Sequence, residues 1–155
     1  MTMAASRSRT LDSPLVAPEV RAWLQAPKKL LIGSRWVEAQ SGKTFSVVDP
    51  STGETLAEVA EADVELAVGA ARRAFEGSWS TISPAERARL MWVLSDLMEQ
   101  HALELAQLES LDTGKPINET QAVDVPLAIE QIRYFAGWAT KITGQTLPVS
   151  FRASI

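Results

Sequence analysis

The sequence lacks cysteine altogether, and it has a single histidine among its 155 residues. Without cysteine, the chain can form no disulfide bond, no zinc site built on thiolates and no cysteine nucleophile. A basic excess is also missing, because 15 lysines and arginines face 19 acidic residues, for a net charge of -4. Proteins that bind nucleic acids carry a clustered basic excess, so we expect no nucleic-acid partner.

No stretch approaches the roughly 18 consecutive apolar residues that span a bilayer. The N-terminus has early arginines but no apolar run after them, so we expect no secretory signal, no membrane partner and a cytoplasmic protein. The chain does contain 46% hydrophobic and 22% charged residues, which is typical of a soluble globular protein. Its length fits one ordinary domain or part of a larger one.

The first 60 residues predict a tail, a short helix and two hairpins. Residues 1–17 are small, polar and interrupted by prolines, which favours a mobile tail, and a short helix is expected to end at Pro27. Gly33-Ser34 and Asp49-Pro50-Ser51-Thr52-Gly53 contain the residues that tight turns require. The strands expected to flank these turns are 30–32 with 35–37, and 44–48 with 55–60.

Three long amphipathic helices are predicted after the hairpins, over residues 63–77, 83–114 and 117–142. Asp63 is suited to cap the first of them. Ser83-Pro84-Ala85-Glu86 combines a capping box with a proline at the first helical position of the second. A single leucine stripe then continues to Leu108. In the third helix, Pro126 either introduces a kink or marks the true start.

The apolar stripes of these helices have no obvious partner within the chain. No run of buried β-branched strands is present that could form a sheet for them to pack on. His101 lies on the leucine stripe, so we interpret it as a structural, partly buried histidine rather than a general base or metal ligand. The five tryptophans are interpreted as core and interface anchors. Residue types alone therefore identify no catalytic residue.

A series of segments, read together and in order, resembles the opening of the aldehyde dehydrogenase superfamily. The match runs from about Lys29 to Ser150. Within the superfamily, the sequence most resembles the bacterial NAD-linked enzymes of broad aldehyde specificity. The segments are Leu31-Ile32-Gly33-Ser34-Arg35-Trp36-Val37, Ser41-Gly42-Lys43-Thr44-Phe45, Asp49-Pro50-Ser51-Thr52-Gly53-Glu54, Ala70-Ala71-Arg72-Arg73-Ala74-Phe75, Leu108-Glu109-Ser110-Leu111-Asp112-Thr113-Gly114-Lys115-Pro116, Tyr134-Phe135-Ala136-Gly137-Trp138-Ala139 and Gly144-Gln145-Thr146-Leu147-Pro148.

The resemblance implies an α/β fold and the oxidation of an aldehyde to a carboxylic acid with NAD or NADP. In such enzymes a cysteine attacks the aldehyde, hydride passes to the cofactor, and a glutamate activates water for thioester hydrolysis. An asparagine amide helps to hold the oxyanion. The catalytic and cofactor-binding residues of the family lie outside this chain, and Asn118 is not in the family's asparagine motif. Assembly as a homodimer or tetramer is also implied.

One family site is carried over residue by residue. Many members bind a monovalent cation such as K⁺ through the two carbonyls before the Asp/Asn-Pro turn, here Val47 and Val48, and through a carboxylate, here Asp112. Oxygen ligands suit a hard cation. The alternative is that Asp112 only caps the turn before Gly114. One further family ligand lies beyond Ile155.

The resemblance also divides the chain. We expect an N-terminal tail over 1–28, the N-terminal part of the cofactor-binding domain over 29–144, and the truncated start of an oligomerisation arm over 145–155. The last five residues leave the family pattern, and a truncation or frameshift near Ser150 is the hypothesis for this departure.

Three hypotheses stay open. The chain is a segment of an aldehyde dehydrogenase that is inactive alone, an interaction module that docks on a full-length relative, or a small domain whose helices pack on each other. Exposed apolar area distinguishes them, because large uncovered patches cause aggregation and dye binding.

Overall fold

The computed structural model describes residues 10–144 of the chain. The oligomerisation strand predicted from Gln145 onward lies outside this range. In chain order the elements are α1 (Pro18–Gln25), β1 (Leu30–Ile32), β2 (Arg35–Val37), β3 (Thr44–Val48), β4 (Thr55–Ala60), α2 (Val64–Glu76), α3 (Ser78–Thr81), α4 (Pro84–Gln100), α5 (Ala102–Thr113), α6 (Ile117–Glu119), the π-helix η1 (Thr120–Asp124) and α7 (Val125–Trp138).

Both predicted hairpins are present, as two separate antiparallel sheets of two strands each. β1 pairs with β2 through a turn in which Gly33 and Ser34 have φ of 57° and 64°. These left-handed values are those of a type I′ turn, whose twist matches that of the flanking strands. β3 pairs with β4 through the turn that starts at Asp49.

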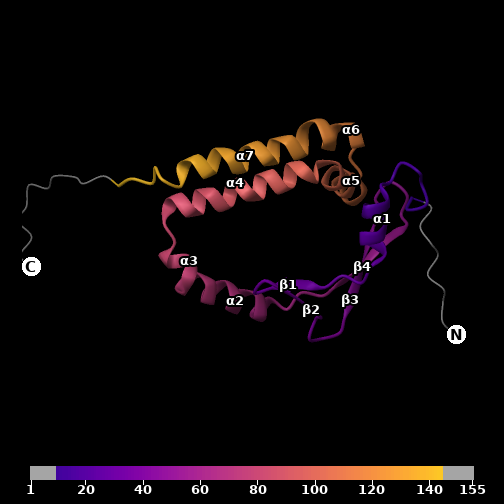
Figure 1. Cartoon of the computed structure of the whole chain (residues 1–155). Coiled ribbons are helices and arrows are strands. Elements are labelled where there is room, and N and C mark those ends of the chain that lie inside the picture. The colour runs from indigo at the N-terminus through magenta and orange to yellow at the C-terminus, as the bar shows by residue number, and fades with distance from the viewer. Residues whose placement is uncertain (1–9, 145–155) are drawn as a thin grey trace, which may run out of the picture.

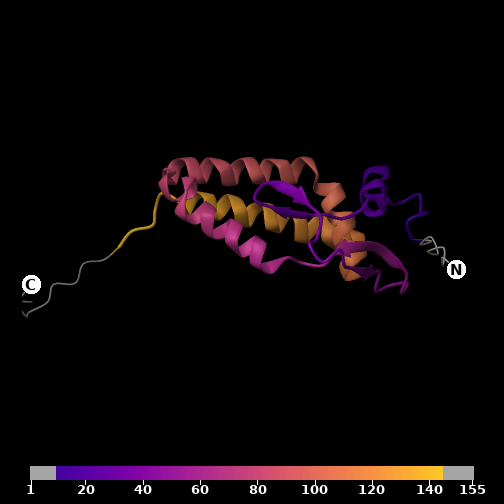
Figure 2. The ribbon, with the colours of Figure 1, turned by 90° about the horizontal axis from the view of Figure 1, so that it is seen from below.

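The helices form two groups that face each other across the molecule (Figure 1). α4 and α7 run side by side, whereas α2, α3 and the β1–β2 hairpin lie on the opposite side of the view. α1, α5 and the β3–β4 hairpin join the two groups at one end, and Figure 2 shows the same arrangement from below. In an α/β sandwich a central sheet lies between two helical layers. Residues 10–144 contain two separate two-stranded sheets and no such central sheet.

The second predicted helix is in fact two helices, and the prediction of one continuous helix over 83–114 is wrong. It starts as expected, because Ser83 Oγ accepts the amide of Glu86 at 3.1 Å. At His101 the backbone leaves the helical region, with φ of -107° and ψ of 22°. The chain then turns into α5, which packs against both α1 and α7.

The third predicted helix is divided as well, into α6, η1 and α7. Pro126 lies in the first turn of α7, so it marks a true start, one of the two outcomes predicted for it. Immediately before it the backbone follows a π-helix, in which Thr120 is completely buried and its hydroxyl donates to the carbonyl of Ala106 at 2.9 Å. α7 ends at Trp138, earlier than predicted.

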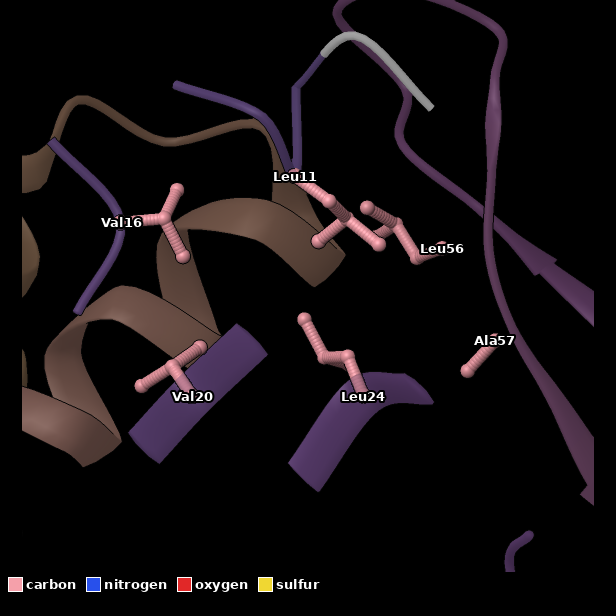
Figure 3. Close-up of a cluster of buried hydrophobic side chains, with 6 residues drawn as sticks. All are labelled: Leu11, Val16, Val20, Leu24, Leu56 and Ala57. Carbon is pink, nitrogen blue, oxygen red and sulfur yellow. The ribbon is translucent and has the colours of Figure 1, made fainter. Parts of the chain in front are cut away.

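Two small cores join α1, β4, α4, α5 and α7, and both include residues of α5. The first consists of the buried residues Leu11, Val16, Val20, Leu24, Leu56 and Ala57, with Leu108 and Leu111 of α5 packed against it (Figure 3). The second consists of Ala106, Val125 and Ile129, with Met98, Ala102 and Leu105 against it. Neighbouring residues of α5 therefore serve different cores.

The first core corrects the prediction of a mobile tail over 1–17. Leu11 and Val16 are 6% and 8% exposed, and both lie within that stretch. Burying side chains of this size stabilises a fold by about 1.5–3 kcal/mol each. Residues 10–17 are therefore a packed part of the molecule.

Candidate functional site

The predicted cation ligands on β3 lie where the β3–β4 ladder is irregular. Val47 pairs with Ala57, but Val48 pairs with Thr55, so Leu56 is an extra residue on β4. Such a bulge disrupts the ladder locally. The carbonyl groups predicted to bind a cation therefore belong to the two residues that flank the interruption.

Asp112, the third predicted ligand, lies near the C-terminal end of α5. Asp112 and Val47 line one cavity of about 380 Å³, so the fold brings these two residues together. Val48 is not in its lining. Most of the other lining residues are apolar, but the lining also includes the charged Lys28. The Lys28 ammonium donates to the carbonyls of Trp23 and Ala26, and burial lowers its pKa.

The alternative role of Asp112, capping the turn before Gly114, is filled by other groups. The amide of Gly114 donates to the carbonyl of Ser110 at 3.0 Å. The hydroxyl of Thr113 donates to the carbonyl of Glu109 at 2.6 Å. These two bonds close the end of α5 without the Asp112 carboxylate.

The turn after Val48 is built around the carboxylate of Asp49, which is 3% exposed. Its Oδ1 accepts the amide of Ser51 at 2.8 Å, and its Oδ2 accepts the hydroxyl of Thr52 at 3.0 Å. The hydroxyl of Thr10 also donates to Oδ2, at 3.0 Å. Burial alone would raise the pKa of Asp49, but these hydrogen bonds outweigh it and hold the pKa below its ordinary value.

The same turn contacts the end of α5 at Gly114. Gly114 has φ of 77°, and a Cβ at this position would lie 3.0 Å from Cγ of Pro50. Only glycine combines the left-handed conformation with so close an approach at low cost. The hairpin that carries Val47 and Val48 is thus held against the helix that carries Asp112.

Replacing Gly114 with alanine is expected to lower the free energy of unfolding by about 2 kcal/mol, because strain at positive φ adds to the clash with Pro50. Urea unfolding measures the change. Gly42→Ala is the matched control, since Gly42 has φ of 64° but a Cβ there meets nothing within 4 Å. Equal losses in the two variants would show that the contact with Pro50 contributes nothing.

The other candidate residues do not form a site. His101 is exposed rather than partly buried as predicted, with its Nδ1 3.0 Å from Oε1 of Glu104. Asp63 precedes α2 but makes no capping bond there, and it accepts the amide of Gln40 at 2.8 Å instead. All five tryptophans are exposed, so none is a core anchor of the described chain. Within residues 10–144, no three His, Cys, Asp or Glu side chains gather as metal ligands.

Comparison with known proteins decides the family. The sequence profile of the aldehyde dehydrogenase family matches residues 36–155, more than half of the chain. The chain belongs to the aldehyde dehydrogenase family. The resemblance drawn from the sequence segments is thereby confirmed.

Individual aldehyde dehydrogenases agree with this assignment. The chain is 58% identical over 139 residues to the aldehyde dehydrogenase homologue DhaS of Bacillus subtilis (strain 168), covering 87% of the chain and 28% of that protein. It is 42% identical over 149 residues to a phenylacetaldehyde dehydrogenase of Pseudomonas fluorescens, covering 94% and 29%. The chain thus spans less than a third of the length of these relatives.

A solved aldehyde dehydrogenase from Bacillus cereus, in complex with NAD⁺, shows the same fold over this region. The TM-score is 0.82 at 48% identity, over 86% of this chain and 28% of that chain. The two hairpins and the helices described above therefore adopt the N-terminal part of the aldehyde dehydrogenase fold, as predicted. In the described range, no helix is long and apolar enough to cross a membrane.

Sequence reasoning missed two residues that shape this aldehyde dehydrogenase segment, Thr10 and Gln107. Thr10 lies in the stretch taken for a tail, and Gln107 was given no role. Gln107 accepts the amide of Ala17 at 2.8 Å and donates to the carbonyl of Leu15 at 2.9 Å. No local pattern points to either residue, because their partners are 39 to 92 residues away in the sequence.

Proposed function

We propose that this chain supplies the N-terminal segment of an oxidoreductase that converts aldehydes to carboxylic acids with NAD or NADP, and that it has no such activity alone. The observation that carries the proposal is the uncovered apolar face of its long helices. α2 has no buried residue, and its Phe75 and Val68 are 62% and 59% exposed. In α4 and α7, Leu94 and Phe135 are 50% and 55% exposed.

Such faces need a cover, because each apolar side chain left in water forfeits about 1.5–3 kcal/mol of stabilisation. Two helical groups that face each other suit the outer layers of an α/β sandwich. The sheet between them would come from the remaining length of the family, and it would carry the cofactor, whose chemistry is to accept hydride. Cytoplasmic location, and assembly as a homodimer or tetramer, stay predictions from composition and resemblance.

The experiment that tests this function compares the chain alone with the chain co-expressed with a separate polypeptide that carries the remaining length of a close relative. Alone, the chain should bind a hydrophobic dye and form no NADH or NADPH from aldehydes. Together, the two polypeptides should co-purify and oxidise aldehydes. A chain that is monomeric and binds no dye would instead be a self-packed domain. Co-purification only with an intact aldehyde dehydrogenase would favour the interaction module.

The proposed segment includes part of a monovalent cation site. The donor set of two carbonyls and one carboxylate suits K⁺, and Val47 and Asp112 share a cavity. The positive charge of Lys28 in that cavity opposes a bound cation, whereas the carboxylates of Glu109 and Asp112 in the same lining favour one. Val47, Val48 and Asp112 would hold the ion and so fix the hairpin relative to α5.

Removal of the Asp112 carboxylate is expected to abolish stabilisation by K⁺ in the complemented protein. The melting temperature is measured in KCl and in tetramethylammonium chloride at equal ionic strength, because the larger cation cannot use a small oxygen site. Asp112→Ala should remove the difference between the two salts. The matched control is Asp96→Ala on α4, which leaves the difference in place. An unchanged difference in Asp112→Ala would exclude Asp112 as a ligand.

A further inference from the structure

Residues 10–25, here called the strap, are bonded to the β3–β4 hairpin at one end. The hydroxyl of Thr10 donates to Oδ2 of Asp49 at 3.0 Å, and its amide donates to Oε2 of Glu54 at 3.4 Å. Asp49 is buried and accepts two further bonds from its own turn, so the contact joins the strap to a hydrogen-bonded turn of the hairpin.

The strap is bonded to α5 further along. The side-chain amide of Gln107 accepts from the amide of Ala17 and donates to the carbonyl of Leu15. The carbonyl and the amino group of the Gln107 side chain thus both bond to the backbone just before α1. Arg21 closes the loop between the two ends, since its guanidinium donates to the carbonyls of Ser13 and Val16.

Side chains along the whole strap, on both sides of the bonds from Gln107, provide most of the first core. Leu11, Val16, Val20 and Leu24 pack on Leu56 and Ala57 of β4 (Figure 3). None of the buried residues of this core comes from α4 or α7, whose own core is centred on Ala106, Val125 and Ile129. Proteins unfold locally in contiguous cooperative units, and a region with its own buried cluster is a candidate for such a unit.

We propose that residues 10–25 are a two-ended strap that locks the β3–β4 hairpin onto α5, and that this unit opens separately from the α4–α7 pair. The strap bridges the two elements that carry Val47, Val48 and Asp112, and so it sets the separation of these residues. This last consequence rests on the cation site of the proposed function, whereas the lock itself does not.

Amide hydrogen exchange on the chain measures the lock. Gln107→Leu removes both bonds to the strap, and the amide of Gly53, which donates to the carbonyl of Asp49 at 2.7 Å, reports on the distant turn. We expect Gly53 to exchange about tenfold faster, with the amides of α7 unchanged. Gln131→Leu, the same change at an exposed position of α7, is the control and should leave Gly53 unchanged.

A second pair of variants keeps the test decisive if Gln107→Leu unfolds the chain. Ala17→Pro removes the donor to Gln107, and the φ of -57° at Ala17 accommodates proline. Thr10→Val removes the hydroxyl at the other end. If the strap acts as a unit, the double variant accelerates exchange at Gly53 by less than the product of the single effects.

Three results would overturn the lock: unchanged exchange at Gly53, equal acceleration in α7, or independent effects of the two ends. A lock that responds as expected, in a protein that K⁺ does not stabilise, would remove the cation site of the proposed function and leave the strap in place.

Discussion

Replacing Asp49 with alanine should lower the free energy of unfolding by about 3 kcal/mol, which is a large effect for one residue. The carboxylate is buried and accepts the amide of Ser51 and the hydroxyls of Thr52 and Thr10. Alanine leaves three donors without this acceptor, and hydrogen bonds to a charged group are stronger than those to a neutral one. The loss also removes the bond between the Thr10 hydroxyl and the hairpin, whereas the bond from the Thr10 amide to Glu54 remains.

Urea unfolding followed by circular dichroism measures the loss. Asp49→Asn keeps one acceptor oxygen at nearly the same volume, so its cost should be about half as large. Asp63→Ala is a control, because Asp63 is half-buried and accepts the amide of Gln40. If Asp49→Ala costs no more than Asp63→Ala, the carboxylate does not hold the turn.

The difference in unfolding free energy between wild type and Asp49→Ala should depend on pH, because the pKa of Asp49 is lowered in the fold. Burial opposes the charged form, yet the hydrogen bonds from Ser51, Thr52 and Thr10 bring the pKa below its ordinary value of 3.8. A carboxyl whose pKa is lower in the folded state contributes stability above its unfolded pKa, and loses it as the pH falls through the folded pKa. The difference between wild type and Asp49→Ala should therefore be constant at neutral pH and shrink below about pH 3.8.

The second large effect is expected in the other core. Ile129→Ala should cost about 2–4 kcal/mol, because Ile129 is 6% exposed and packs with Val125 and Ala106 where α7 crosses α5. The alanine leaves a cavity that helices on both sides cannot fill without moving. Urea unfolding and hydrogen exchange in α7 are the measurements.

The control for Ile129 is the same substitution at Ile142, which is 82% exposed. Ile142→Ala should change the free energy of unfolding by less than about 0.5 kcal/mol. In Ile129→Ala, amide exchange at Gly53 should accelerate only as far as the lower global stability of the variant accounts for. A larger rise would mean that the two cores are one cooperative unit.

Local chemistry predicted the features that a few neighbouring residues decide. Gly33 and Ser34 adopt the positive φ of the expected turn, Ser83 caps α4, and Pro126 lies in the first turn of α7. Each of these outcomes depends on the side chain itself or on a bond within one turn. The hairpin strands were predicted with the same bounds that the structure has.

Features decided by distant contacts were not predicted. The leucine stripe keeps its helical spacing through His101, so nothing local signals the break between α4 and α5. The break follows from packing, because α5 contacts α1 whereas α4 lies along α7. Likewise, Thr10 and Gln107 reveal their roles only once residues 39 and 90 positions away are placed beside them.

The placement of α5 in both cores has a consequence for synthesis on the ribosome. The amide of Ala17 cannot form its hydrogen bond until the acceptor, Gln107, has been synthesised 90 residues later. At roughly 5–20 residues per second, the interval is on the order of 5 to 18 seconds. During that time the first 60 residues have emerged with their strands formed at most as isolated hairpins, which are marginally stable in water. Neither core can close until a single twelve-residue helix has left the exit tunnel.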